Sequence, residues 1–347
     1  MTRETTPGPT VPPGKGPPVT HQNPASPTRI LPAHILPACI VVDWGTTSFR
    51  AALVTQDGKT LERTETSDGI QHIVDRAYEP VLMGALRAWF AAHGPLPVVA
   101  LGMITSKTGW VEVPYVPCPA RPADLAAGAI SRHLPNGARL IFLAGLTDPA
   151  RKPFADVMRG EETQILGFGL SRDAIVVLPG THSKWARVRG GAIDGFQTFV
   201  TGEVYALLTH HSFIARSAGP AGGATDWAAF QRGLDLTAAP DDTADALLSL
   251  LFSARTGLLA GQLSAGQIRD YVSGLVIGHE FREARGQGWF SAGDRVGIVG
   301  NDGLNTRYTR AAHAFGLSVI DGGEDAAIAG AVALLGGVNR GRSSDAA

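Results

Sequence analysis

One stretch of this sequence occurs twice, and that repeat limits the folds that are open to the chain. Residues 40–53 (IVVDWGTTSFRAAL) align without a gap to residues 175–188 (IVVLPGTHSKWARV), and seven of the fourteen positions are identical. Each copy opens with β-branched residues, which predict a buried strand, and continues through a turn of glycine and hydroxyl residues into a second strand. Such a repeat indicates two units of one topology, and we expect both turns to face one cleft.

The elements predicted around the two copies follow a similar order. The first half is expected to have strands at 39–43, 49–55, 60–66, 97–101 and 139–144 and helices near 73–92, 123–133 and 162–170. The second is expected to have two strands within 175–188, further strands at 192–200, 295–299 and 317–320, and helices from 201, near 244–263, 264–282 and 304–314, and after 324. We therefore predict an α/β fold of two βββαβα(β) domains, at 38–172 and 173–340, with tails at 1–37 and 341–347.

Composition argues against several classes of partner. The 30 lysines and arginines nearly balance the 31 acidic residues, so the chain has no broad basic field for nucleic acid or anionic lipid. No apolar run approaches the roughly 18 to 20 residues of a membrane helix. The proline-rich first 37 residues lack the apolar centre of a secretory signal, and we expect them to be disordered. The sequence leaves the oligomeric state open, a homodimer included.

The cysteine and histidine content points to a reducing compartment. Cys39 and Cys118 are the only two cysteines, and each lies beside apolar residues, which argues against a disulfide framework or a thiolate metal site. The ten histidines show no ligand spacing, so we expect no structural or catalytic zinc. These features predict a cytoplasmic protein.

The two turns carry the groups that phosphoryl transfer requires. Gly45 and Gly180 allow the backbone to approach phosphate oxygens without a Cβ in the way. Further donors are expected from Thr46, Thr47, Thr181, His182 and Ser183. One turn of this composition alone is more often structural, but its duplication favours a phosphate site. The alternative phosphate loop, Gly-x-x-x-x-Gly-Lys-Ser/Thr, does not occur in the sequence.

The two copies differ where their functions would have to differ. Asp43 ends the first strand of the first copy, where the second copy has Leu178. A single carboxylate suits Mg²⁺, which keeps several waters and takes one or two carboxylates along with phosphates, although an acid can also simply cap a turn. Lys184 could reach a phosphate as a point charge, or it could be an exposed strand lysine.

The motifs resemble those of the actin, heat-shock-protein-70 and hexokinase superfamily, which has two ribonuclease-H-like domains around a nucleotide cleft. Residues 43–48 and 179–184 resemble its two phosphate motifs, and residues 298–303, with Gly300 and Gly303, resemble its adenosine motif. Residues 157–164 (VMRGEETQ) and 178–185 (LPGTHSKW) resemble the 2-dehydro-3-deoxygalactonokinase family, over about residues 38–338. The resemblance implies ATP and Mg²⁺ as cofactors and phosphorylation of 2-dehydro-3-deoxy-D-galactonate at O6, in galactonate and galactose catabolism.

The resemblance also implies a general base and a substrate pocket. In carbohydrate kinases of the superfamily an acid follows a glycine shortly before the second phosphate motif, and Glu161 takes that place, with Glu162 left open as the alternative. Either acid could instead only stabilise the start of a helix. We expect Arg159 to bind the substrate carboxylate, ahead of the weaker candidates Arg50 and Lys107. Residues 103–110 resemble the substrate-side loop and contribute Ser106 and Trp110, although Trp110 taken alone is more readily a core residue than a sugar contact.

Other functions remain open at the level of sequence. The chain could phosphorylate another sugar or keto-sugar acid, such as 2-dehydro-3-deoxygluconate. A nucleotide-gated interaction protein of the same fold is a second alternative, but it would need filament surfaces or a further substrate-binding domain. A sugar-sensing transcription regulator would need a DNA-binding helical module in the region where the prolines lie.

Overall fold

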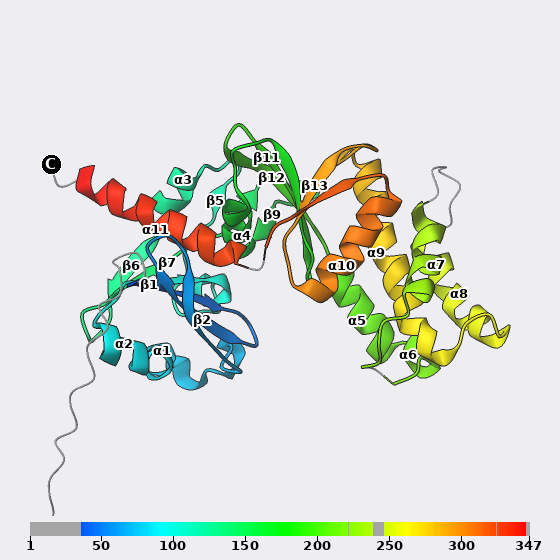
Figure 1. Ribbon diagram of the computed structural model, residues 1–347, viewed down its shortest axis with the longest axis horizontal. Coiled ribbons are helices and arrows are strands. Elements are labelled where there is room, and N and C mark those ends of the chain that lie inside the picture. Colours follow the sequence, from blue (N-terminus) through cyan, green and yellow to red (C-terminus); the bar gives the residue numbers. More distant parts are fainter. Residues whose placement is uncertain (1–35, 221, 239–245, 324, 345–347) are drawn as a thin grey trace, which may run out of the picture.

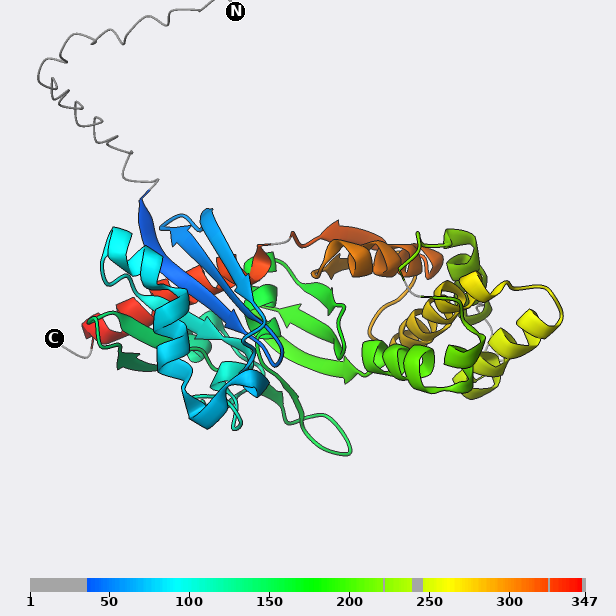
Figure 2. The same ribbon diagram turned by 90° about the horizontal axis from the view of Figure 1, so that it is seen from below.

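The computed structural model describes residues 36–220, 222–238, 246–323 and 325–344, which form two α/β halves arranged along the long axis of the molecule (Figures 1 and 2). The first sheet has the strand order β3-β2-β1-β4-β7-β6, and the second has the order β12-β11-β10-β13-β14. In both, three antiparallel strands are followed by two that run parallel to the first, which gives the common order 3-2-1-4-5. The predicted duplicated ribonuclease-H-like fold is confirmed.

The first half carries six strands in its main sheet and a small third sheet of order β5-β8-β9. Its elements are β1 (Pro37–Trp44), β2 (Phe49–Thr55), β3 (Thr60–Thr66), η2 (Ile70–His72), η3 (Val74–Arg76), α1 (Tyr78–Ala85), α2 (Arg87–His93), β4 (Val98–Leu101), η4 (Gly102–Thr105), β5 (Val116–Pro117), α3 (Pro122–Ala127), β6 (Ile130–His133), β7 (Arg139–Phe142), β8 (Leu146–Asp148), β9 (Asp156–Met158) and α4 (Glu161–Phe168).

Two helix predictions in this half need correction. The helix expected near 73–92 is divided into α1 and α2 at Leu86. The helix expected near 123–133 ends at Ala127, and Ile130–His133 instead forms the edge strand β6 antiparallel to β7. Pairing with the free edge of β7 overrides the local helical pattern there. The short strands of the third sheet were not predicted from the sequence.

The second half combines its sheet with a group of helices. Its elements are β10 (Ala174–Leu178), β11 (Ser183–Arg189), β12 (Ala192–Phe199), α5 (Thr201–His211), α6 (Phe213–Ser217), α7 (Trp227–Ala238), α8 (Leu247–Leu259), η5 (Ala265–Gln267), α9 (Ile268–Gly286), β13 (Arg295–Ile298), α10 (Asp302–Ala314), β14 (Ser318–Asp321) and α11 (Ala326–Ser344). Helices α6 and α7 were not predicted. Residues 1–35, 244, 245 and 324, on which parts of the predictions fall, lie outside the described residues, as do residues 345–347.

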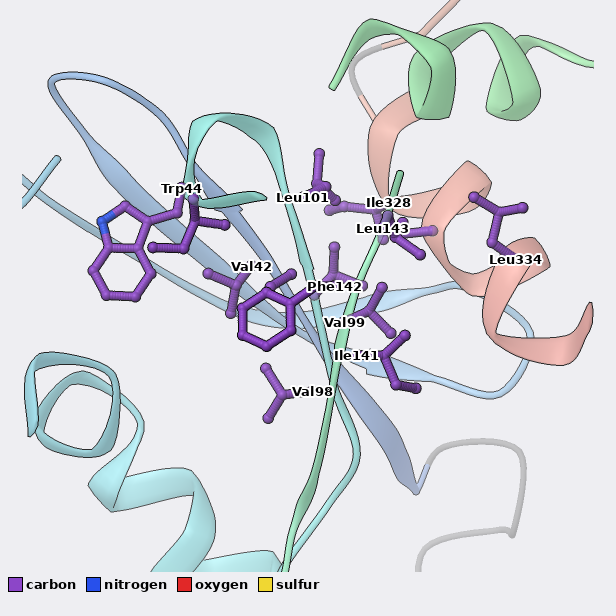
Figure 3. Packing of buried hydrophobic residues seen from close by; sticks show 14 of the residues in the cluster. Val42, Trp44, Val98, Val99, Leu101, Ile141, Phe142, Leu143, Ile328 and Leu334 are labelled. Carbon is purple, nitrogen blue, oxygen red and sulfur yellow. The ribbon is translucent and has the colours of Figure 1, made fainter. Parts of the chain in front are cut away.

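The last helix of the chain packs on the first half. Ile328 and Leu334 of α11 cover one face of the first sheet, above the buried side chains of β4 and β7 (Figure 3). Helix α11 also crosses α4 at backbone distance, since a Cβ on Gly330 would lie 1.9 Å from the Thr163 carbonyl oxygen and one on Gly167 would lie 1.8 Å from that of Ala326. Although the sequence-based boundary puts α11 in the domain 173–340, its apolar face belongs to the first core.

The second sheet lies between two hydrophobic cores. Val176, Leu178 and Ala186 contribute to the core of the first half, whereas Val177 and Trp185 contribute to the core that helices α7 and α9 complete. This division follows from the pleat, because successive side chains of a strand point to opposite faces. In the described ranges, no helix is both long and apolar enough to cross a membrane.

Candidate active site

A cleft of about 1090 Å³ lies between the two halves. Its first wall is made by the strands β1 to β3, through Asp43, Arg50 and Glu65 among others. The opposite wall is made by Pro179, residues 300–303 and the start of α11. Of the segments predicted to bind phosphate, only Asp43 and Pro179 line this cavity, together with the predicted adenosine segment.

The first turn is a tight backbone loop that contacts the segment at Gly69 and Ile70. The Gly45 N–H donates to the Ser48 carbonyl (2.9 Å), and the Gly45 carbonyl accepts from the Ile70 N–H (3.0 Å). Gly69 packs so closely under the turn that a Cβ there would lie 2.2 Å from the carbonyl carbon of Thr47. The side chains of Thr46 and Thr47 are exposed. The turn thus has a fixed backbone and accessible hydroxyl groups, as a phosphate loop requires.

The second turn is held against the start of α5. The Glu203 N–H donates to the Thr181 carbonyl (2.9 Å), and a Cβ on Gly202 would lie 2.3 Å from the Gly180 carbonyl oxygen. The exposed His182 ring contacts the Glu203 carboxylate through Nε2 at 2.6 Å. Thr181 and His182 line a separate cavity of about 300 Å³ beside α5, rather than the large cleft.

Ser183 does not offer its hydroxyl to the cleft. The residue is fully buried, and its Oγ donates to the carboxylate of Glu280 on α9 at 2.7 Å. Because Ser183 and Lys184 are successive residues of β11, their side chains lie on opposite faces of the sheet, and only Lys184 points toward the first half. The prediction that the Ser183 hydroxyl binds phosphate is wrong, because that hydroxyl is buried against Glu280. Only the backbone of Ser183 remains for a phosphate contact.

Lys184 meets the candidate base between the two turns. Its side chain is 4% exposed, and its Nζ lies 3.3 Å from Oε1 of Glu161 and donates to the His182 carbonyl at 3.2 Å. The other carboxylate oxygen of Glu161 accepts from the Arg159 N–H at 3.0 Å. The lysine is therefore not an exposed strand lysine, because it is buried in an ion pair that joins the halves.

Asp43 lies deep in the cleft, with 39% of its side chain open to it. Burial raises the pKa of its carboxyl group, the Arg50 guanidinium at 3.8 Å lowers it, and the Glu161 carboxylate raises it further. Gly102 approaches the carboxylate so closely that a Cβ there would lie 2.9 Å from Oδ1. Glu161 is thus close enough to Asp43 to influence the charge of the Asp43 carboxylate.

Glu162, the alternative base, lies in the protein interior. It is 1% exposed, and both of its carboxylate oxygens accept from the Gly160 N–H, at 2.7 and 3.0 Å. Burial raises the pKa of Glu162 to about 8. Gly160 has a positive φ of 110° and directly precedes α4, so the helix directs the two successive glutamates in different directions.

Arg159 is a partly buried cation beside the substrate-side loop. Its Nη1 donates to Oγ1 of Thr105 (2.7 Å), its Nη2 donates to the Val113 carbonyl (2.9 Å), and its guanidinium lies 4.2 Å from the ring centroid of Tyr115. Its Nε is buried without a hydrogen-bond partner. None of the ion pairs found within the described ranges involves Arg159.

The two substrate-loop residues differ in their surroundings. Ser106 is nearly buried, and its Oγ lies 3.1 Å from Oγ1 of Thr108. Trp110 packs on the aromatic rings of Tyr78 and Phe142, at centroid distances of 6.1 and 5.5 Å. These contacts place Trp110 against the core of the first half, in keeping with the alternative that the sequence left open.

The predicted adenosine segment turns into α10 at the edge of the cleft. Asn301 caps the helix, since its Oδ1 accepts from the Leu304 N–H at 3.0 Å. Nδ2 of Asn305 donates to the Gly300 carbonyl at 3.0 Å, and a Cβ on Gly300 would lie 2.9 Å from Oδ1 of Asn305. Gly300 and Gly303 thus bring an open stretch of backbone to the cavity wall.

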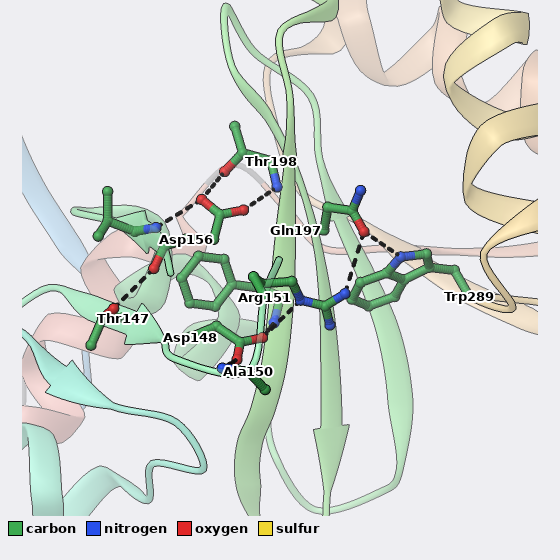
Figure 4. A network of polar contacts seen from close by, with 10 residues as sticks. Thr147, Asp148, Ala150, Arg151, Asp156, Gln197, Thr198 and Trp289 are labelled. Carbon is green, nitrogen blue, oxygen red and sulfur yellow. Dashed lines mark hydrogen bonds and ion pairs between the residues drawn. The ribbon is translucent and has the colours of Figure 1, made fainter. Parts of the chain in front are cut away.

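A polar network fixes the strand before the candidate base to the second sheet (Figure 4). Asp156 of β9 accepts from the Thr198 N–H (2.6 Å) and from its Oγ1 (2.8 Å), and Asp148 of β8 accepts from the Phe196 N–H (3.0 Å). Sequence reasoning missed these residues, because each contact joins positions more than 40 residues apart and no local pattern marks them.

The comparisons with known proteins agree with this arrangement. A model of the 2-keto-3-deoxy-galactonokinase family matches residues 43–334. A Rhizobium meliloti protein named as a probable 2-dehydro-3-deoxygalactonokinase is 36% identical over 284 residues, which cover 80% of this chain and 90% of that protein. The Escherichia coli 2-dehydro-3-deoxygalactonokinase is 31% identical over 303 residues, 86% of this chain and 95% of the relative.

A solved structure supports the same assignment. The crystal structure of a Sinorhizobium meliloti protein described as a member of the 2-dehydro-3-deoxygalactonokinases superposes with a TM-score of 0.75 at 32% identity, and the match covers 85% of this chain and 97% of that one. Together with the duplicated fold, these matches show that the chain belongs to the 2-keto-3-deoxy-galactonokinase family.

Proposed function

We propose that this protein transfers the γ-phosphoryl group of ATP to O6 of 2-dehydro-3-deoxy-D-galactonate. The product would be the 6-phosphate of that acid, with ADP released. The observation that carries the proposal is the contact of Glu161 with Lys184, because it pairs a carboxylate that can act as a base with a cation that can stabilise a γ-phosphate. Family membership supplies the substrate class.

The proposed roles follow from the positions of the side chains. Glu161 accepts the proton of the O6 hydroxyl as it attacks the γ-phosphorus, and the glutamate keeps its orientation through the Arg159 N–H. Lys184 stabilises the negative charge that collects on the transferred group. The two side chains neutralise each other in their ion pair, and a bound triphosphate would attract Lys184 and leave the carboxylate free to accept the proton.

The phosphates of ATP would be held by backbone from both halves. The turns at 45–48 and 180–183 offer N–H groups, and the exposed Thr46, Thr47 and Thr181 offer hydroxyls. Gly300 and Gly303 would receive the adenosine at the opposite wall of the cleft. His182 and Lys184 complete the set of side chains that we assign to the nucleotide.

Asp43 fits the carboxylate of a magnesium site. No group of three or more potential metal-binding side chains was found where the structure is described, and Mg²⁺ in kinases needs only one or two carboxylates besides phosphate and water. Asp43 lines the cleft, and a bound cation would stabilise the charged form of its carboxylate, which partial burial disfavours by raising its pKa. Asp43 would hold the ion, which would neutralise charge on the phosphates.

Arg159 is proposed to bind the carboxylate of the sugar acid. Its guanidinium is held by two hydrogen bonds and by the Tyr115 ring, so it presents an ordered fork with no internal counter-charge among the described ion pairs. A planar guanidinium matches a carboxylate better than an ammonium group does. Ser106 and Trp110 would line the remainder of the substrate pocket.

The proposal is tested by ADP release from purified protein with MgATP. We expect turnover with 2-dehydro-3-deoxy-D-galactonate that exceeds the sugar-free blank, and a lower kcat/KM with its C4 epimer, the gluconate derivative. A ³¹P spectrum of the product checks the position of the phosphate. Turnover with another sugar but none with this acid would overturn the substrate assignment.

A further inference from the structure

Glu280 is a buried carboxylate for which the proposed reaction has no use. It lies on α9 and is 2% exposed. Its Oε1 accepts from Oγ of Ser183 and from Nε1 of Trp185, each at 2.7 Å, and its Oε2 accepts from the hydroxyl of Tyr308 at 2.6 Å. The side chain of Thr201 donates a further hydrogen bond to the carboxylate. Burial raises the pKa of Glu280, and these four hydrogen bonds oppose that rise.

A buried carboxylate stabilises a hydrophobic core less well than an apolar side chain does. Removing the charge from water costs free energy that an apolar side chain of the same size would not incur. The carboxylate does offer geometry, because its oxygens fix the positions of several donors at once. The donors here lie on three separate elements, β11, α5 and α10, and the bonds to Ser183 and Tyr308 span 97 and 28 residues.

Three of the four donors lie next to segments that we assign to the nucleotide site. Ser183 ends the second phosphate turn, and Thr201 opens α5, whose Gly202 touches the Gly180 carbonyl. Tyr308 lies on α10, whose first turn follows Gly300 and lines the cleft. The fourth donor, Trp185, instead packs among the aromatic rings of Phe281 and Phe290 in the second core.

We propose that Glu280 is a positioning residue for nucleotide binding. Its carboxylate sets the distance between the second phosphate turn, the start of α5 and the adenosine segment. These segments can then contact the phosphates and the base of one nucleotide at the same time. The proposal depends on the proposed kinase function in one respect, which is that the cleft binds a nucleotide. It predicts that nucleotide affinity depends on Glu280, although Glu280 does not touch the nucleotide.

The test measures the affinity of MgADP by calorimetry, without sugar acid, for three variants. Glu280→Leu leaves the donors without an acceptor, and we expect the Kd to rise at least tenfold. Glu280→Gln keeps one carbonyl oxygen for Ser183 and Trp185, and its amide can donate to the Tyr308 hydroxyl, so its Kd should stay within threefold of wild type. Tyr308→Phe removes only the bond to α10 and should raise the Kd by about three- to tenfold.

Trp185→Phe is the matched control. It removes one donor to the same carboxylate but leaves all three nucleotide-bordering donors in place, so the melting temperature should fall while the Kd for MgADP stays unchanged. In Glu280→Leu and Tyr308→Phe, the KM for ATP should rise while the KM for the sugar acid at saturating ATP does not.

Two results would overturn the proposal. One is wild-type MgADP affinity in both Glu280→Leu and Tyr308→Phe. The other is a Trp185→Phe variant that loses as much affinity as Tyr308→Phe, since Glu280 would then support only the general stability of the second half. If Glu280→Leu does not fold, the comparison of Tyr308→Phe with Trp185→Phe still decides the question. Normal MgADP binding without sugar-acid turnover would contradict the proposed function and leave this inference intact.

Discussion

Gly202 offers a direct test of how the second phosphate turn is positioned. It lies in the first turn of α5, where a Cβ would be 2.3 Å from the Gly180 carbonyl oxygen and 2.8 Å from the Thr181 α-carbon. Both neighbours are backbone atoms, so no side chain can rotate away. Reaching an ordinary contact of 3.4 Å requires the helix and the turn to separate by about 1 Å.

The expected cost of Gly202→Ala is large for so small a change. A displacement of about 1 Å of a group that positions substrate can cost roughly 100-fold in rate, which corresponds to about 3 kcal/mol of transition-state stabilisation. The loss should appear in kcat/KM for ATP, because the displaced turn holds phosphate. Steady-state ADP release measures it, and a melting curve establishes that the variant is folded.

Gly84→Ala is the matched control. Gly84 is also a helical glycine, in α1, but nothing lies within 4 Å of the Cβ that alanine would add. Both substitutions improve helix propensity by roughly 0.5 to 1 kcal/mol, so only the contact with the turn distinguishes them. A folded Gly202→Ala protein with a kcat/KM within threefold of Gly84→Ala would refute the reasoning.

Three further substitutions test the remaining roles. Glu161→Gln should lower kcat by about 10² to 10⁴ while the calorimetric Kd for MgADP changes little, and unchanged turnover would exclude Glu161 as the base. Arg159→Lys keeps the charge but loses the fork, so the KM for the sugar acid should rise about tenfold or more at constant KM for ATP; equal changes in both would argue against a carboxylate contact. Because the pKa of Glu162 is raised to about 8, folding retains a proton that the unfolded chain releases, and that stabilisation is present at low pH and lost as pH rises toward 8. Urea unfolding at pH 5 and pH 7.5 should show wild type losing about 3 kcal/mol more than Glu162→Gln, and parallel losses would contradict the raised pKa.

The repeat made much of the architecture predictable from the sequence. Its β-branched runs identify the first strand of each sheet, and the identical Gly-Thr-x-Ser turns require the two copies to continue in the same way. The strand order 3-2-1-4-5 in both sheets follows from that equivalence. The edge strand β6 was not predictable, because its conformation comes from pairing with β7 rather than from its own residues.

The sequence predicted the candidate site only where its residues lie together in one short motif. Glu161 and Glu162 are indistinguishable by composition, and only the rotation of about 100° per residue from the start of α4 separates an acid that pairs with Lys184 from one in the core. Strand alternation similarly turns Ser183 away from Lys184. Glu280 could not be found at all, since its partners come from distant segments and no pattern marks an isolated glutamate as buried.

The position of α11 has a consequence for the synthesis of the protein. The helix is made last, yet Ile328 and Leu334 complete the hydrophobic core that begins at β1. At a translation rate of roughly 5 to 20 residues per second, about 10 to 30 seconds separate the end of the first half from the emergence of its covering helix. During that interval the apolar face around Leu101 and Leu143 lacks its native cover, so the newly made first half depends on the rest of the chain, or on a chaperone, to avoid aggregation.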